Sequence, residues 1–506
     1  MIKCPSCGAE QRFDIATQMM KCEYCGTTSE VPPDEEGKTA DTTYETNIFT
    51  CPNCGGEIES SSEEAAGFCP YCGETTTFGK RLSAARRPEK IIPFQKTKED
   101  CKKAYLEKLK HAIYAPDDMK NEKYIDSFRG IYMPYWQYNI DVAGKVTGES
   151  QKTDNQGSFD LVTNYRNSCD VKAHYSGFLY DSSTAYSDSV SRAVEPYHHE
   201  KALPFRMGYI MGFYTDAEDV PADFYLPDAV QAAEGKVRDD AARKFFPGNC
   251  TNLQFTKTDE AVDQERVLMP VWFMSYKNGN RVAYSAVNGQ TGEIAVDIPV
   301  DPKKFMIGTA FITLILFIIL SLFTITPLAT MTLSSLALAA AAATFTNALR
   351  HTNANIINDA EPAKKGNGLK AEKSERKPGV IGSLIAGVFF GFVFISLLQN
   401  GSKVQSPEYT VMLGIVVFIF ILVKALGKKP EEAKGSWMEY LLMLAADAVI
   451  TVIAYYHPAN DLWYYLPSTF AIVSAVLAAV STIRRFNILS THKMPQFARK
   501  GGDDRA

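Results

Sequence analysis

The sequence has few of the residues and motifs that active sites most often use. Histidine occurs only seven times in 506 residues, and His198-His199 is the one adjacent pair. No metalloprotease helix motif, nucleophile elbow or dinucleotide-binding glycine pattern is present. These absences argue against the common hydrolases and oxidoreductases. We therefore expect a protein that is not an enzyme, with His198-His199 in an ordinary loop.

The first 80 residues contain few large apolar side chains and few basic residues. They contain five Lys and Arg against fourteen Asp and Glu, a local net charge of −9, whereas the whole chain carries −5. Nucleic-acid-binding modules depend on basic side chains that contact phosphates. This charge argues against nucleic acid as the partner of the segment and favours a protein partner of basic or mixed charge.

Cysteine, by contrast, is concentrated in this segment. Eight of the eleven cysteines form four Cys-x-x-Cys pairs, while Cys101, Cys169 and Cys250 are isolated, which favours metal sites in a reducing compartment over disulfides. Two such pairs complete a tetrahedral Cys4 site, which favours zinc and leaves no open position for catalysis. We predict two structural zinc ions. The predicted ligands are Cys4, Cys7, Cys22 and Cys25 at one site and Cys51, Cys54, Cys69 and Cys72 at the other.

The two cysteine clusters belong to one repeated unit. Both read Cys-Pro-x-Cys-Gly-x-Glu at the front and Cys-x-Tyr-Cys-Gly at the back, and fourteen residues separate the pairs in each. A unit this small has no core of its own, so bound zinc should supply roughly 10–16 kcal/mol of its folding free energy. We expect chelation to unfold residues 1–80 and leave the rest folded. A redox pair and an iron–sulfur cluster are the alternatives, and the Gly, Thr and Pro after the cysteines argue against a redox helix.

These residues resemble the zinc ribbons of transcription factor IIB and rubredoxin-like proteins. The layout is also similar to a family of bacterial zinc-ribbon membrane proteins of uncharacterised function, some of which are labelled as relatives of the primosomal replication-restart helicase. The helicase resemblance covers only the eight cysteines and their glycines. The segment 73–81 has five residues between its glycines where a phosphate loop has four, and Arg81 stands where Ser or Thr would bind Mg²⁺. Helicase activity is therefore not expected.

Residues 81–302 are expected to form a duplicated α+β domain. The segment 89–94 is repeated at 200–205, and Met-Pro-Tyr-Trp at 133–136 is repeated as Met-Pro-Val-Trp at 269–272. Trp136 and Trp272 are interpreted as core residues of equivalent strands, with a peptide-binding groove as the alternative.

Local signals place helices and strands in this domain. Thr97 with Asp100 forms a capping box for a helix through about Ala115, and a second helix is expected over 229–246. The apolar positions of the first helix should be Ala104, Leu106, Leu109 and Ile113. The alternating segments 271–276 and 281–287, joined by an Asn-Gly turn, predict a β-hairpin. Cys101, with two lysines beside it, is expected to be inert.

Six apolar runs follow, and each approaches the roughly 20 residues needed to cross a bilayer. We place them at Phe305–Thr326, Leu328–Leu349, Val380–Leu398, Thr410–Leu426, Met438–Tyr456 and Leu462–Ile483. Basic residues cluster before the first run, in the 350–379 and 427–436 segments and after the last run, whereas the alternate connections hold at most one. The positive-inside rule then predicts a multi-pass protein of the cell membrane with both termini cytoplasmic. The basic loops should meet anionic lipid headgroups.

Asp447 stands at the midpoint of the fifth run. An aspartate at that depth costs roughly 2.5–3.5 kcal/mol on an insertion scale, so it must face other helices, a cavity or a partner. A hydrogen bond from Ser474 or Thr469 would make it structural. Without such a bond it is a candidate functional site within the membrane, with Glu439 as a second acidic group.

The sequence thus predicts a multidomain chain whose function is protein docking or scaffolding. Its alternatives are a transporter or membrane enzyme that uses Asp447, and a membrane-associated nucleic-acid-binding protein. Protein partners should bind the ribbons and the α+β domain. The expected parts are zinc ribbon 1 (1–30), an acidic linker (31–47), zinc ribbon 2 (48–80), a duplicated α+β cytoplasmic domain (81–302), a six-span α-helical transmembrane domain (303–485) and a basic cytoplasmic tail (486–506).

Overall fold

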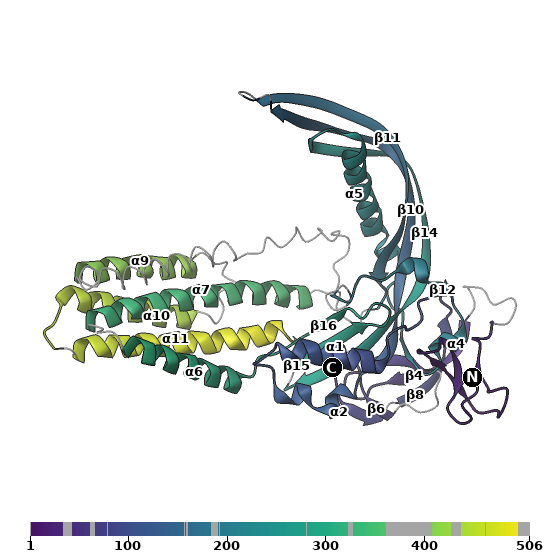
Figure 1. The fold of residues 1–506 in the computed structure, drawn as a ribbon, viewed down its shortest axis with the longest axis horizontal. Coiled ribbons are helices and arrows are strands. Elements are labelled where there is room, and N and C mark those ends of the chain that lie inside the picture. The colour runs from purple at the N-terminus through teal and green to yellow at the C-terminus, as the bar shows by residue number, and fades with distance from the viewer. Residues whose placement is uncertain are drawn as a thin grey trace, which may run out of the picture.

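The computed structural model describes most of the chain. The described residues are 2–33, 43–60, 66–77, 79–155, 157, 160–183, 191, 193–279, 281–321, 327–360, 407–426, 437–460 and 462–493. A sheet-rich body carries the N-terminus at one end, and a group of apolar helices extends from the other end (Figure 1). The third predicted span, 380–398, lies outside the described residues.

Three β-sheets form the body. A three-stranded sheet has the order β1-β2-β3, a two-stranded sheet pairs β6 with β7, and a twelve-stranded sheet has the main path β12-β9-β14-β10-β13-β5-β4-β8. In the large sheet β11 pairs with β10, while β15 pairs with β14, β16 and β17. The strands are β1 (Gln11–Asp14), β2 (Met19–Cys22), β3 (Thr28–Ser29), β4 (Thr43–Thr50), β5 (Glu57–Ser60), β6 (Ala66–Phe68), β7 (Thr75–Thr77), β8 (Gly79–Arg86), β9 (Lys90–Ile91), β10 (Arg129–Asn155), β11 (Asp160–Asp181), β12 (Leu203–Pro204), β13 (Tyr214–Asp216), β14 (Asn249–Asn278), β15 (Arg281–Asn288), β16 (Ile294–Val296) and β17 (His492–Lys493).

The repeated sequence motifs meet each other inside the large sheet. Met133 on β10 lies directly opposite Met269 on β14 in an antiparallel ladder, and Ile91 on β9 lies opposite Leu203 on β12. Trp136 and Trp272 are both buried, and each indole nitrogen donates to a backbone carbonyl, at 2.9 and 2.8 Å. Their surroundings agree with the interpretation of both tryptophans as core residues.

Strands β10, β11 and β14 continue beyond the body as a long curved arm (Figure 1). Helix α5 (Leu226–Phe245) covers part of it and buries Ala229, Ala233, Val237 and Ala241, a row of small side chains at four-residue spacing. Small residues at this spacing let the helix approach the sheet closely, against a cluster that includes Tyr138. The second predicted helix is therefore present with slightly different ends.

The first predicted helix is present as α1 (Lys98–Lys110), and Thr97 with Asp100 forms the expected capping box. Its buried residues are Cys101, Tyr105 and Leu109. The predicted apolar face was wrong in part, because Leu106 is 39% exposed and Ile113, beyond the end of the helix, is 76% exposed. Short helices α2 (Glu122–Ile125) and α4 (Met207–Ile210) complete the body.

The apolar helices are α6 (Pro302–Ser321), α7 (Pro327–Ala360), α9 (Pro407–Leu426), α10 (Trp437–Tyr456) and α11 (Leu462–Leu489). Of the part of the chain that the structure describes, α9, α10 and α11 are long and apolar enough to cross a membrane. A shorter apolar stretch, Thr330–Thr346, lies within α7. Helices α7, α9, α10 and α11 pack against one another (Figure 1).

The body holds both ends of this helical group. Asn487 on α11 exchanges two hydrogen bonds with the backbone of Val300, at 2.7 and 2.8 Å, just before α6 begins. Arg281 on β15 donates to the Thr491 hydroxyl at 2.7 Å, and β17 then pairs with β15. The start of α6 and the end of α11 therefore lie together on the side of the body.

Candidate metal centres

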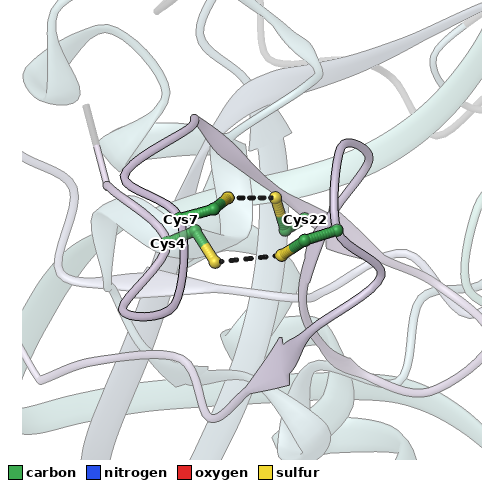
Figure 2. A group of neighbouring side chains, drawn as sticks. Cys4, Cys7 and Cys22 are labelled. Carbon is green, nitrogen blue, oxygen red and sulfur yellow. Dashed lines mark hydrogen bonds between the residues drawn. The ribbon is translucent and has the colours of Figure 1, made fainter.

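The eight cysteines of the repeat form two compact groups. In each group the four Sγ atoms lie within 4.8 Å of one another, and these are the only such groups of possible metal ligands in the described ranges. In the first group Cys4 lies 3.5 Å from Cys25 and Cys7 lies 3.5 Å from Cys22, measured between Sγ atoms (Figure 2).

These distances fit a tetrahedral thiolate site. A zinc–sulfur bond of about 2.3 Å requires neighbouring sulfurs about 3.8 Å apart. The second group has this spacing, because Cys51 to Cys72 and Cys54 to Cys69 are both 3.8 Å. All eight ligand atoms are thiol sulfurs, the donor set that suits zinc and other thiophilic ions.

Backbone turns aim the sulfurs at each site. Gly8 and Gly26 both have φ of +74°, and their amides donate at 2.9 Å to the carbonyls of Cys4 and Cys22. The second repeat has the same turns at Gly55 and Gly73, with φ of +76° and +71°. A residue with a β-carbon is strained at such angles, so the glycine after each second cysteine is required by the turn.

One ligand of the first centre, Cys25, favours the ionised form. Interactions with the Thr27 hydroxyl and the Thr27 backbone amide lower the pKa of Cys25 to about 6, and Thr27 Oγ1 lies 3.1 Å from Cys25 Sγ. The thiolate is the form of cysteine that binds metal, so Thr27 prepares a ligand.

The two centres differ in exposure. Cys7 and Cys25 of the first centre are exposed, whereas all four cysteines of the second are at most 3% exposed. The second group belongs to the hydrophobic core of the body, together with Phe273 and Tyr284. Strands β4 and β5 beside it are members of the twelve-stranded sheet.

One repeated residue shows the difference most clearly. Tyr24 and Tyr71 occupy the same position in the two Cys-x-Tyr-Cys turns, yet Tyr24 is 86% exposed and Tyr71 is 1% exposed. The Tyr71 hydroxyl donates to Asp216 Oδ1 at 2.6 Å, and the Tyr284 hydroxyl donates to the Tyr71 carbonyl at 2.9 Å. The second cysteine unit, called ribbon 2, therefore docks onto the body through its Cys-x-x-Cys turns.

The first ribbon docks the other way round. Phe13 on β1 and Met20 on β2 belong to a core cluster with Met211, and the Phe13 amide donates to the Met211 carbonyl at 3.1 Å. Strands β1 and β2 contact the body. Cys7 and Cys25 of its cysteine turns are exposed, and this unit lies at the end of the molecule away from the apolar helices (Figure 1).

Two buried carboxyl groups lie behind the second centre. Asp216 accepts from the Ser183 hydroxyl at 2.5 Å as well as from Tyr71, and burial raises its pKa to about 6. Burial and the nearby Asp216 carboxylate raise the pKa of Glu59 on β5 to about 8, although a hydrogen bond from Tyr44 acts in the opposite direction. No sequence pattern indicates this pair, because its members are 157 positions apart and come together through the pairing of β13 with β5.

The remaining soluble candidates take no part in the metal centres. His198 and His199 lie beside Glu200, with nitrogen–oxygen distances of 3.4 and 3.7 Å. Cys101 is buried on α1, and burial raises the pKa of its thiol. A cavity of about 380 Å³ lies near Tyr135 and Tyr197, beside β11, and no sequence motif indicates it.

The acidic residues of α10 have different surroundings. Glu439 accepts from Ser481 of α11 at 2.6 Å. Asp447 is fully buried, and neither predicted donor reaches it: Ser474 donates to the Phe470 carbonyl at 2.9 Å and Thr469 to the Tyr465 carbonyl at 2.8 Å. Both hydroxyls thus bond the backbone of their own helix.

Comparison with known proteins gives one informative relative. The chain is 29% identical over 312 residues to "Uncharacterized protein YdjG" of Bacillus subtilis (strain 168), an alignment that covers 60% of this chain and 91% of the relative. No family model matches the chain. No solved structure matches it significantly. The two tetracysteine groups are consistent with zinc ribbons, while membership of a particular ribbon family remains a prediction.

Proposed function

We propose that the chain is a docking protein anchored in the cell membrane. Two structural zinc ions would hold the ribbons on the cytoplasmic side, and ribbon 1 would bind a protein partner. Ribbon 2 would serve the body as a fixed structural element. The anchor would have the six spans predicted from the sequence, with both termini cytoplasmic and the basic loops against anionic lipid headgroups.

The contrast between Tyr24 and Tyr71 carries this proposal. Ribbon 2 buries its turn tyrosine against Asp216, so the repeat demonstrates within the same chain how such a turn binds a protein surface. Ribbon 1 has the same turn but leaves Tyr24 86% exposed. Tyrosine is among the residues that most often dominate protein interfaces, because its ring buries a large area and its hydroxyl adds a hydrogen bond.

The arrangement of the molecule supports a partner on the cytoplasmic side. The exposed turns of ribbon 1 lie at the end opposite the apolar helices (Figure 1). The start of α6 and the end of α11 both return to the body, as an even number of spans requires. Arg484 and Arg485 lie near that end of α11, in agreement with the positive-inside rule.

The test compares partners of the full-length protein in native membranes. A photocrosslinking amino acid at position 24, and affinity purification of the unmodified chain, should identify the same small set of proteins. Tyr24→Ser should weaken binding of the identified partner by about 30-fold or more, which corresponds to the loss of about 2 kcal/mol at an interface hot spot. Binding is then measured with the purified partner.

The matched control is Tyr165→Ser on β11, because Tyr165 is also exposed (38%) but lies on the arm. This variant should keep full affinity. Recovery of the same partner, with unchanged affinity, from the Tyr24→Ser variant would contradict docking through ribbon 1.

A transporter or membrane enzyme is the second candidate. The one observation that favours it is the full burial of Asp447 without the structural hydrogen bond expected from Ser474 or Thr469. Intramembrane carboxyl groups of this kind commonly serve transport.

A further inference from the structure

Asp447 is enclosed by apolar side chains. It is 0% exposed on α10, and the core cluster of the helical group includes Met443 and Ile450 of the same helix, Val417 of α9 and Leu338 of α7. An ionised carboxylate without a partner in such surroundings costs several kcal/mol. The carboxyl group must therefore either have a cationic partner or be neutral.

Neither carboxyl oxygen has a hydrogen-bond partner. The hydroxyl of Ser335 on α7, which is 1% exposed, lies close enough to interact with this carboxyl group, although the two side chains do not have the distance and angle of a well-formed hydrogen bond. Thr451 donates instead to the backbone carbonyl of Asp447 at 2.9 Å. Asp447 and Ser335 thus form a pair of buried polar groups on facing helices with unused hydrogen-bonding capacity.

No charged side chain on the described helices faces Asp447. In the sequence, the acidic, basic and histidine positions of the helices packed around it stand toward the helix ends: Arg350, His351 and Asp359 on α7, Glu408 and Lys424 on α9, Glu439 on α10, and Arg484 and Arg485 on α11. Glu439 is the nearest along α10, two helical turns away, and bonds Ser481. No described cationic group is placed to neutralise Asp447.

A metal cation does not fit the pair. Hard cations take six or more oxygen ligands, whereas the site offers two carboxyl oxygens and one hydroxyl. A proton needs only one oxygen to bind and one acceptor for the resulting O–H group. Ser335 can accept that hydrogen bond, and its own hydroxyl hydrogen remains free to turn elsewhere.

We propose that Asp447 and Ser335 form a proton-binding site within the membrane bundle. The Asp447 carboxyl group holds one proton at neutral pH and donates it in a hydrogen bond to the Ser335 hydroxyl oxygen, which links α10 to α7. The proton leaves when water reaches the carboxyl group, so the site couples proton occupancy to the packing of these two helices. This inference is independent of docking through ribbon 1.

Infrared difference spectroscopy of the full-length protein in lipid vesicles tests the site. The spectrum of the unmodified protein minus that of Asp447→Asn at neutral pH should contain the carbonyl band of a protonated carboxylic acid. Ser335→Ala should keep that band and move it to higher frequency, because the acid loses its hydrogen-bond acceptor. Glu439→Gln, the matched control on the same helix, should leave the band unchanged.

An ionised carboxylate signal in that difference spectrum would overturn the proposal, as would a band unaffected by Ser335→Ala. If Asp447→Asn does not fold, the band is identified by its shift in Ser335→Ala and its loss at high pH in the unmodified protein. Absence of both changes would then equally overturn the site.

Discussion

The Tyr71 hydroxyl lies 2.6 Å from Asp216 Oδ1, which joins a metal-binding turn to a buried strand of the body. Asp216 sits on β13, which pairs with β10 of the body on one side and β5 of the ribbon on the other. This hydrogen bond is one of several that connect the second cysteine group to the large sheet, together with those from Tyr284 to the Tyr71 carbonyl and from Ser275 to the Cys69 carbonyl. The equivalent hydroxyl of Tyr24 is exposed.

Replacement of Tyr71 should destabilise the protein while the same replacement of Tyr24 should not. Tyr71→Phe leaves buried Asp216 without one of its donors, which we expect to cost about 1–3 kcal/mol. Tyr24→Phe removes an exposed hydroxyl and should change stability by less than about 0.5 kcal/mol. Thermal unfolding of both variants in detergent checks the difference. Equal effects would show that the Tyr71–Asp216 bond does not stabilise the body.

Loss of metal should affect the two centres differently. Metal analysis should find two zinc ions per chain, and Cys7→Ser and Cys54→Ser, at equivalent positions of the repeat, should each remove one. Cys7→Ser should unfold ribbon 1 alone, because Cys7 is exposed. Cys54→Ser should also loosen the body, because Cys54 belongs to its core cluster.

Limited proteolysis checks this prediction. The region 81–302 should remain resistant in Cys7→Ser and become sensitive in Cys54→Ser. The structure thus modifies the expectation that chelation spares everything beyond residue 80. That expectation treated both ribbons as units separate from the body. If the body stays resistant to protease in both variants, the present prediction is wrong and the original expectation holds.

Stability should fall as pH rises through the range in which Glu59 titrates. Its pKa is raised from 4.5 to about 8, so between these values the folded protein keeps a proton that the unfolded chain has released. The free energy of unfolding therefore falls as pH rises, by about 3–5 kcal/mol in total at most. The loss is complete above about pH 8.

Glu59→Gln isolates this effect, because the amide is neutral at every pH. The variant should match the unmodified protein near pH 4.5 and be more stable near pH 8, as measured by thermal unfolding across this range. Glu107→Gln, on the exposed face of α1, is the control and should keep the original pH dependence. A Glu59→Gln variant with an unchanged pH profile would refute this assignment.

Short-range features of the fold could be predicted from the sequence. The Cys-x-x-Cys spacing and the following glycines define turns within five residues, and the capping box of Thr97 and Asp100 needs only its own helix. The residues that form the buried face of α1 were harder to predict. Tyr105 and Leu106 are adjacent, and only tertiary packing decides that Tyr105 is buried while Leu106 is exposed.

Long-range relationships could not be predicted in the same way. Tyr24 and Tyr71 have nearly identical local sequences, so their different environments depend on which face of each ribbon meets the body. The lengths of β10 and β14, 27 and 30 residues, were also missed. The outer half of β14 has no buried residue, and the outer half of β10 alternates buried and exposed residues as far as Ser150. Both halves are strands through pairing with each other and, for β10, with β11.

Topology of the membrane helices gives the last prediction. Ile113 on the body and Ala459 between α10 and α11 are both exposed, and they should lie on opposite sides of the membrane. In intact cells a maleimide that cannot cross the membrane should therefore label Ala459→Cys and not Ile113→Cys, while after permeabilisation it should label both. The unmodified chain is the background control, since it contains eleven cysteines. Labelling of Ile113→Cys in intact cells would place the body and ribbon 1 outside, where a cytoplasmic partner could not reach Tyr24.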